Sequence, residues 1–519
     1  MASGMRLLRC LPALLICLAA GCSILQPEPP PTPGFWQPPT VENEPATFTP
    51  SPQASLVSPP AIETGAVVLP TLPAITATPA ATRIPAPFLG SVMGIELTGQ
   101  NFGELADLAA VAGAHWLRWN AIYWSAIEKA PGQRDWNVLA NLDAQLKLVA
   151  QAGLRPILMV RSTPTWAQMF QTYSCGPIGP EDLTIFGDFM YELVLRYSVE
   201  PYNVKYWEIW NEPDVDPRLV PPNQIFGCWG DEADPYYGGG YYADMLQAVY
   251  PRIKEADPQS QVLVGGLLMD CDPVNPPLNA DGVPAYCAPS LYLKGILENS
   301  GGDYFDGVSF HAYDYYDAAS GYYSNSNWHS GWNYSGLVPV TAAKTRYLKA
   351  VLSEYGYYDK LLINSETALV CGKLGTEEYC QTGYFEQMKT YYVAQSYSTA
   401  LAEGLYGNVW YHLVTGWRGS GLMSREQLPT AAFEAYQFAA QQLTGALYWG
   451  SVGGTGGVFG YKFRIGEREI WVVWSLDAQP HTLSLPSLPS GVFDVLGNPL
   501  AVESEAIITV APIYIVWNP

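Results

Sequence analysis

The chain has 519 residues, of which 48 are acidic and 26 are basic, so its formal net charge is -22. This charge argues against a protein that binds nucleic acid, because phosphate binding requires a basic face. With 48% hydrophobic and 14% charged residues, the chain is not disordered as a whole, and its length predicts more than one domain.

The first 22 residues have the pattern of an export signal. Two arginines precede an apolar run from Leu11 to Ala20, which is too short to span the roughly 30 Å of bilayer hydrocarbon. The residues that end in Gly21-Cys22 resemble the lipobox of bacterial lipoproteins, in which the cysteine is lipidated. The resemblance implies a lipid anchor at Cys22 on a cell-surface or membrane-anchored protein. Cleavage as a plain signal peptide is the alternative and would give a secreted protein.

Residues 23–87 have an unusual composition, since they hold 17 of the 44 prolines. Proline lacks a backbone N–H and fixes φ, so this segment cannot form a helix or a central strand. We expect a disordered tether that holds the folded part away from the membrane surface. No other stretch has 18 uninterrupted apolar residues, so no further membrane span is expected.

Six cysteines lie beyond this tether, an even number that favours disulfides in an exported protein. Six cysteines allow 15 pairings, and the sequence alone does not settle the connectivity. The pairs that we expect are Cys271–Cys287, Cys371–Cys380 and Cys175–Cys228. The first two pairs each bracket one short loop, and the third joins the cysteines that are left. A zinc site is the alternative, but no C-x-x-C or close Cys/His spacing supports it, so we expect no metal and no cofactor.

Between residues 88 and 443, short apolar runs alternate with longer segments of helical periodicity. The expected strands are 88–97, 115–120, 155–161, 204–210, 261–267, 304–313, 360–366 and 408–413. The expected helices are 101–114, 139–153, 182–197, 241–256, 289–299, 340–354, 381–403 and 430–443. This alternation is typical of parallel strands with crossover helices, and the number of units predicts an α/β fold of the (β/α)8 TIM barrel type. A doubly wound open sheet is the alternative, but its glycine-rich phosphate turn is missing.

From residue 444 onward the sequence has strand patterns without helical ones. The alternating runs are 458–465, 469–475, 481–485, 491–495 and 506–517. They predict a small antiparallel β-sandwich domain over 444–519 that packs against the barrel.

Two of the expected barrel strands end in a glutamate. The fourth runs into Asn211-Glu212-Pro213, and because Pro213 cannot continue a sheet ladder, we expect Glu212 at the barrel mouth. The seventh ends in Glu366. TIM-barrel enzymes place their catalytic groups at the C-terminal ends of the strands, so this pair of carboxyls is the candidate catalytic centre.

The order of these motifs resembles the clan A retaining glycoside hydrolases, in particular families 39 and 5. The resemblance covers residues 88–443 and implies that Glu212 is the acid/base and Glu366 the nucleophile. It further implies that Asn211, Arg118, His311 and Tyr313 contact the substrate or the two carboxyls. The strand-eight Trp410 would be the aromatic platform beneath the sugar, and Trp166 ends a Thr-Pro-x-Trp motif similar to one in the clan. The implied activity is hydrolysis of poly- or oligosaccharides by double displacement.

Other interpretations remain open at this stage. Glu208 lies deeper on strand four, where a structural ion pair is expected, and Trp417 is an alternative sugar platform. The tyrosine pairs 236–237 and 315–316 either line sugar subsites or pack within loops. A non-catalytic glycan-binding lipoprotein and a transglycosylase are the alternative functions. We expect a monomer, and the sequence leaves the sugar, the linkage and endo or exo action undetermined.

Overall fold

The computed structural model describes residues 90–97, 102–170, 173–215, 226–278, 281–324, 332, 336–414, 416–453 and 456–519. The predicted signal segment, the lipidation site Cys22 and the tether over 23–87 lie outside the described residues, as do the first two residues of the predicted first strand.

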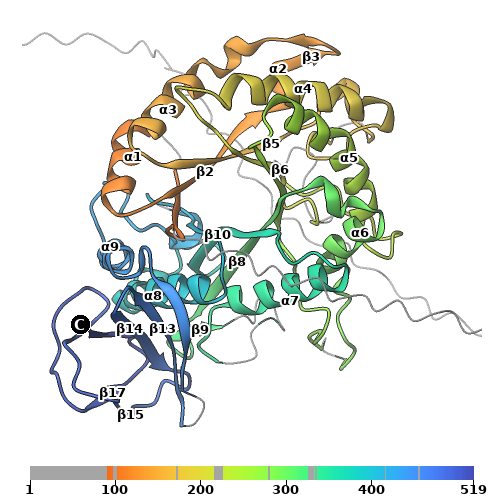
Figure 1. Ribbon diagram of the computed structural model, residues 1–519. Coiled ribbons are helices and arrows are strands. Elements are labelled where there is room, and N and C mark those ends of the chain that lie inside the picture. Colours follow the sequence, from red (N-terminus) through yellow and green to blue (C-terminus); the bar gives the residue numbers. More distant parts are fainter. Residues whose placement is uncertain are drawn as a thin grey trace, which may run out of the picture. The chain divides into compact units, whose positions relative to one another are not determined.

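Eight parallel strands form a closed barrel (Figure 1). They are β1 (Met93–Glu96), β2 (Trp116–Tyr123), β5 (Arg155–Arg161), β6 (Tyr206–Asn211), β7 (Gln261–Leu267), β8 (Gly307–Asp317), β10 (Leu361–Cys371) and β11 (Gly407–Trp410). The strands pair in chain order, and the pairing of β1 with β11 closes the ring. Each strand overlaps the run predicted for it, so the predicted TIM barrel is confirmed, and the open-sheet alternative is excluded because the sheet closes.

Eight helices follow the strands and form the outer layer of the barrel (Figure 1). They are α1 (Phe102–Val111), α3 (Ala140–Gln151), α4 (Leu183–Tyr197), α5 (Gly239–Ala256), α6 (Tyr292–Glu298), α7 (Val340–Glu354), α8 (Gly383–Ala402) and α9 (Ala431–Leu443). Smaller elements decorate the loops: α2 (Trp124–Ile127), the hairpin of β3 (Glu128–Ala130) and β4 (Gln133–Arg134), and β9 (Tyr322–Ser324), which pairs with β8.

The barrel interior is layered, with an apolar floor below a charged layer. Trp116, Ile157 and Leu263 belong to a separate apolar cluster contributed by five of the barrel strands. Because side chains alternate along a strand, the residue two places after Trp116, which is Arg118, points into the same interior one layer higher. The apolar floor therefore excludes water from beneath the groups at the C-terminal ends of the strands.

The C-terminal strands form two sheets. Five strands make an antiparallel sheet in the order β12 (Leu447–Gly453), β13 (Val458–Ile465), β14 (Arg468–Ser475), β18 (Ile513–Trp517) and β16 (Gly491–Phe493). A second sheet pairs β15 (His481–Ser484) with β17 (Glu505–Ile508). An apolar cluster that includes Trp471, Ile508 and Ile515 joins the sheets, which confirms the predicted β-sandwich. The sequence did not predict β12, and it predicted β17 and β18 as one strand over 506–517.

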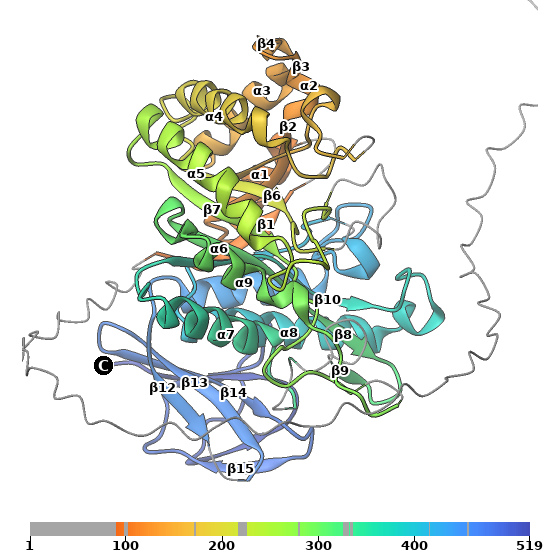
Figure 2. The same cartoon turned by 90° about the vertical axis from the view of Figure 1, so that its right-hand side faces the viewer.

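The other face of the five-stranded sheet lies beside α8 (Figure 2). Phe463 and Trp474 belong to the same buried cluster as the barrel core. The Trp474 indole N–H donates to the Leu337 carbonyl over 2.7 Å. The apolar core thus runs continuously from the barrel into the β-sandwich.

Three disulfides lie in the loops that follow barrel strands. They join Cys175 to Cys228, Cys271 to Cys287 and Cys371 to Cys380, so all three predicted pairs are confirmed. Among the described residues, no helix is long and apolar enough to cross a membrane.

Candidate active site

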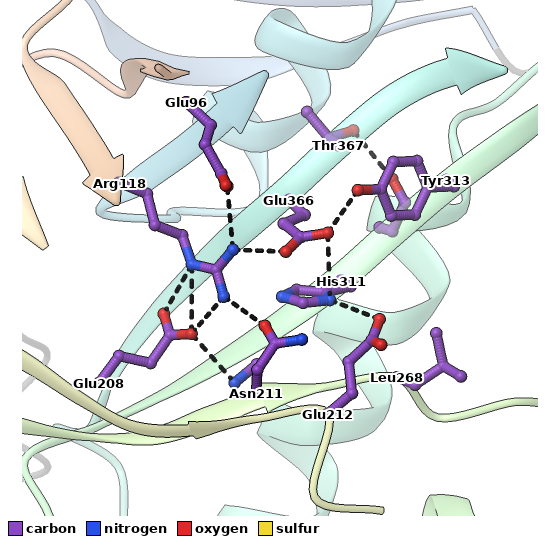
Figure 3. Close-up of polar contacts among 12 residues, drawn as sticks. Glu96, Arg118, Glu208, Asn211, Glu212, Leu268, His311, Tyr313, Glu366 and Thr367 are labelled. Carbon is purple, nitrogen blue, oxygen red and sulfur yellow. Dashed lines mark hydrogen bonds and ion pairs between the residues drawn. The ribbon is translucent and has the colours of Figure 1, made fainter. Parts of the chain in front are cut away.

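Arg118 is the centre of a buried charge network at the C-terminal ends of the strands (Figure 3). Its Nη1 lies 3.0 Å from a carboxylate oxygen of Glu96 and also contacts Glu366. Its Nη2 lies 2.6 Å from Glu208 and 2.6 Å from Oδ1 of Asn211. These contacts satisfy the planar guanidinium group on all sides. They also place Glu208 in the ion pair that we expected.

The charge of Arg118 is maintained by its neighbours. The side chain is completely buried, and burial of an unpaired charge is strongly unfavourable. Burial alone would lower the pKa of Arg118, but the carboxylates of Glu208, Glu366 and Glu96 raise it well above its ordinary value. Arg118 is therefore a permanent cation beside Glu366.

Glu366 is held by hydrogen-bond donors on both of its oxygens. Oε1 accepts from Arg118, and Oε2 accepts from the Tyr313 hydroxyl over 2.5 Å. Burial raises the pKa of Glu366, whereas His311 and Arg118 act in the opposite direction. Hydrogen-bond donors to both oxygens stabilise the ionised form of a carboxyl. These contacts therefore favour the negatively charged form of Glu366.

Glu212 has a different environment. Its backbone N–H donates to the Gly266 carbonyl over 3.0 Å, and its Oε1 lies 2.8 Å from Nδ1 of His311. Burial raises the pKa of Glu212 to about 7, although Arg118 and Lys344 act to lower it. A carboxyl with this pKa is protonated in a weakly acidic solution and can donate a proton.

The backbone at the end of β6 explains how neighbouring residues reach the same site. Strict alternation would place Asn211 and Glu212 on opposite faces of the strand. Trp210 and Glu212 instead have φ of 76° and 48°, in the left-handed region. This turn directs Trp210 outward against Trp229 and brings Asn211 to Arg118. Left-handed backbone is unfavourable for residues other than glycine and is often found at functional sites.

His311 connects the two carboxyls. Its Nδ1 lies 2.8 Å from Glu212 and 3.5 Å from Glu366. Burial lowers the pKa of His311 to about 4, so the ring is neutral near pH 7. Gly266 packs directly against the ring, where a Cβ at position 266 would lie 2.1 Å from Nε2. Only glycine at position 266 leaves room for this imidazole.

Glu212, His311 and Glu366 each offer one ligand atom, and these atoms lie within 4.8 Å of one another. They are the residues that could hold a metal ion. However, Glu366 already accepts hydrogen bonds from the cation of Arg118 and from Tyr313. A metal ion would have to displace these donors and would be repelled by Arg118. These contacts fit a pair of reactive carboxyls better than a metal centre.

The structure contradicts the prediction that Trp410 is the sugar platform. Trp410 is completely buried, and its indole N–H donates to the Ser420 carbonyl over 2.8 Å, so neither face of its ring is accessible to a sugar. The alternative residue, Trp417, is 37% exposed, and its ring centroid lies 5.5 Å from that of Tyr313. Although Trp410 ends β11, its ring packs into the buried core against Tyr392 of α8, whereas Trp417 lies in the following loop.

The other aromatic predictions have mixed outcomes. Trp166 is partly buried, and its indole N–H donates to the Glu128 carbonyl over 3.1 Å, so this hydrogen bond ties it to the loop after β2 rather than to the two carboxyls. Tyr237, Tyr315 and Tyr316 are buried, which favours loop packing over open sugar subsites.

Sequence reasoning missed Glu96 and Lys344. Glu96 ends β1 and is an ion-pair partner of Arg118. Glu96 could have been selected from the sequence, because an acidic residue at the end of a barrel strand points to the mouth. Lys344 lies on the buried face of α7 together with Thr341, Thr345 and Leu348, and nothing in the sequence marks it as part of the site.

Comparison with known proteins identifies the fold. No protein family model matches the sequence, and no curated protein matches it. A family 39 glycoside hydrolase from Bacteroides cellulosilyticus matches 84% of this chain and 83% of its own, with 16% identity and a TM-score of 0.61.

Two further solved structures cover nearly all of their own chains. A GH30 endoxylanase from Clostridium papyrosolvens matches 84% of this chain and 98% of its own, with 10% identity and a TM-score of 0.55. A conserved exported protein from Bacteroides fragilis matches 82% of this chain and 98% of its own, with 11% identity and a TM-score of 0.55. The predicted resemblance to family 39 glycoside hydrolases is thus confirmed at the level of the fold.

Proposed function

We propose that this protein is a retaining β-glycoside hydrolase that cleaves poly- or oligosaccharides. The observation that carries the proposal is the pair of buried carboxyls in unlike environments, Glu366 beside a cation and Glu212 beside a neutral imidazole. Glycoside hydrolysis requires one carboxylate and one carboxylic acid on opposite sides of the scissile bond. Oxygen atoms of the two groups within 4.8 Å match the short separation of retaining enzymes better than the wider gap of inverting ones.

In the first step, a carboxylate oxygen of Glu366 attacks the anomeric carbon. The bond from this carbon to the leaving oxygen breaks as Glu212 gives its proton to that oxygen, which yields a glycosyl ester on Glu366 and a free alcohol. The negative charge of Glu366 is then lost, so the pKa of Glu212 falls and the group becomes a base.

In the second step, Glu212 takes a proton from water, whose oxygen attacks the anomeric carbon and releases Glu366. Asn211 supports both steps, because its carbonyl oxygen is bound by Arg118. Within the part of the chain that the structure describes, no acceptor pairs with its NH2 group, which is available for a sugar hydroxyl. Trp417 is the proposed stacking surface for the sugar.

The proposed location is outside the cytoplasm. Three disulfides favour an oxidising compartment, and one protein of the same fold is named as exported. We retain lipidation of Cys22 as part of this proposal. The sugar is not assigned, although one protein of the same fold is named as an endoxylanase.

The proposal is tested with Glu366→Ala and a panel of aryl β-glycosides and polysaccharides. We expect turnover to fall by roughly 10⁴-fold or more, because the nucleophile is removed, while NMR of wild-type products shows the retained anomer first. Glu128→Gln is a matched control, since Glu128 is a buried acid that pairs with Arg134 over 2.9 Å outside the site.

Full activity of Glu366→Ala, or an inverted first product, would refute the mechanism. Oligosaccharide binding without any product would instead support the glycan-binding alternative. Products longer than the substrate would indicate transglycosylation by the same residues.

A further inference from the structure

Lys344 is a buried cation on the helix that packs behind the site. Its side chain is completely buried on α7. The ammonium group donates to the carbonyl of Leu268 over 2.6 Å and to the carbonyl of His311 over 2.8 Å. Leu268 directly follows β7 and His311 lies within β8. One ammonium group therefore joins the end of β7 to the middle of the neighbouring strand β8.

Both of these strands support Glu212. The β7 end contains Gly266, whose carbonyl accepts the Glu212 backbone N–H over 3.0 Å. The middle of β8 contains His311, whose ring nitrogen lies 2.8 Å from the Glu212 carboxyl. A change in the spacing of β7 and β8 would consequently move the backbone support and the side-chain partner of Glu212 relative to each other.

The contacts of the Lys344 ammonium group are with backbone carbonyls. Among the described residues, no carboxylate oxygen forms an ion pair with its ammonium group. The carboxyls that act on its charge are Asp214 and Asp270, which lie in the loops after β6 and β7, Asp314, which lies within β8, and Glu212 itself. Asp214 accepts the Leu268 and Met269 backbone N–H groups, and Asp314 accepts from Val340 and Tyr392.

This arrangement is costly for the fold alone. A buried ammonium loses its hydration, and an apolar side chain of similar length would fill the same space without that loss. Burial lowers the pKa of Lys344 to about 7, while the four carboxyls act to raise it. The group is thus charged on the acidic side of pH 7, where Glu212 holds its proton and works as the acid.

We propose that Lys344 is a positioning residue for the acid/base Glu212. By tying the carbonyls of Leu268 and His311 together, it fixes the distance between the backbone and the imidazole that orient the carboxyl, and its charge favours release of the Glu212 proton. This inference rests on the proposed glycosidase function.

The test compares Lys344→Met with the wild type on two aryl glycosides of the same sugar. Phenyl glycosides need the proton from Glu212, whereas 2,4-dinitrophenyl glycosides have a leaving group that departs without one. We expect kcat/KM of the variant to fall roughly 100-fold on the phenyl substrate and less than about 3-fold on the dinitrophenyl substrate. We also expect the alkaline limb of its pH profile to move to higher pH, because a cation near Glu212 is lost.

Lys389→Met is the matched control. Lys389 is a buried lysine on α8 whose ammonium group donates to the carbonyls of Gly419 and Gly421 and pairs with Glu386 over 2.8 Å, so it holds the loop after β11 rather than the strands that support Glu212. Its loss should lower both rates by the same factor. Lys344→Gln keeps an NH2 group that can donate to a carbonyl, and it is the second variant if Lys344→Met does not fold. We expect the same difference between the two substrates, but a smaller one.

An equal loss on the two substrates, or an alkaline limb that does not move, would overturn the role of Lys344 while leaving the proposed function intact. A wild-type protein inactive on both substrates and on polysaccharides would overturn the proposed function, and this inference with it.

Discussion

At the scale of single residues, two chemically identical side chains differ because of their neighbours. Glu366 accepts hydrogen bonds from a permanent cation and a phenol. Glu212 has a neutral imidazole beside it, and Arg118 and Lys344 only partly offset the effect of burial on its pKa. In a buried site, electrostatic interactions are strong because water is excluded, so these contacts separate the roles of the two carboxyls.

The pH dependence of activity follows from this difference. The acid must be protonated, and burial raises the pKa of Glu212 to about 7. Activity should therefore be present below pH 7 and fall roughly tenfold per pH unit above it. The measurement is kcat/KM of an unactivated aryl glycoside between pH 4 and 9. The Glu212→Gln variant should lose the alkaline limb of the profile. A wild-type kcat/KM that already falls above about pH 5 would contradict the assignment of Glu212 as the acid.

At the scale of elements, the barrel strands provide the reactive groups and the loops after them hold these groups in place. The loop after β6 is pinned on both sides. The Trp210 indole N–H donates to the Cys175 carbonyl over 2.8 Å, and the Cys228 N–H donates to the Val215 carbonyl over 2.9 Å. The disulfide between Cys175 and Cys228 joins these two supports around the turn that carries Glu212.

Removal of that disulfide should reduce activity as well as stability. For the double variant Cys175→Ser with Cys228→Ser, we expect about 2–5 kcal/mol less free energy of unfolding, together with a fall in kcat. The control is Cys271→Ser with Cys287→Ser, which removes a disulfide from a loop without a catalytic side chain. Denaturant unfolding and kcat are measured for both. Equal kcat losses in the two variants would show that the first disulfide has no particular role in the site.

At the scale of the whole described chain, the barrel and the β-sandwich share one core. Besides the contact of Trp474 with Leu337, the rings of Phe438 on α9 and Tyr514 on β18 lie 5.0 Å apart in an edge-on arrangement. Burial of a continuous apolar surface couples the unfolding of the elements on both sides of it.

We therefore expect residues 90–519 to unfold in a single transition in calorimetry. Deletion of 447–519 should expose the apolar surface of α8 and α9 and give an insoluble or strongly destabilised barrel. The control is Ile507→Ser on the outer sheet, where Ile507 is 62% exposed and its loss should change the melting temperature little. Two well-separated transitions in the intact protein would show that the β-sandwich is an independent domain.

Much of the fold could be predicted, because strand and helix periodicities depend on local sequence. The strands 155–161 and 261–267 have the predicted bounds, and α7 has the predicted range 340–354. Glu212 and Glu366 could be selected because each ends a strand. β12 could not be predicted, since its sequence contains two glycines and has no clear alternation of apolar and polar residues. Most of its side chains are exposed or only partly buried.

The sequence by itself determined the order of elements and the two candidate carboxyls, which depend on spacing along the chain. It favoured one set of disulfide pairs among the 15 that six cysteines allow, and the structure settled the pairing. The tertiary structure alone decided that Trp410 is buried, that Glu96 joins Arg118 and that Lys344 lies behind His311. These relations arise only when the barrel closes, because closure sets which side chains from distant strands and helices meet. The turn after Glu208 that brings Asn211 and Glu212 to one face likewise depends on contacts with the neighbouring strands.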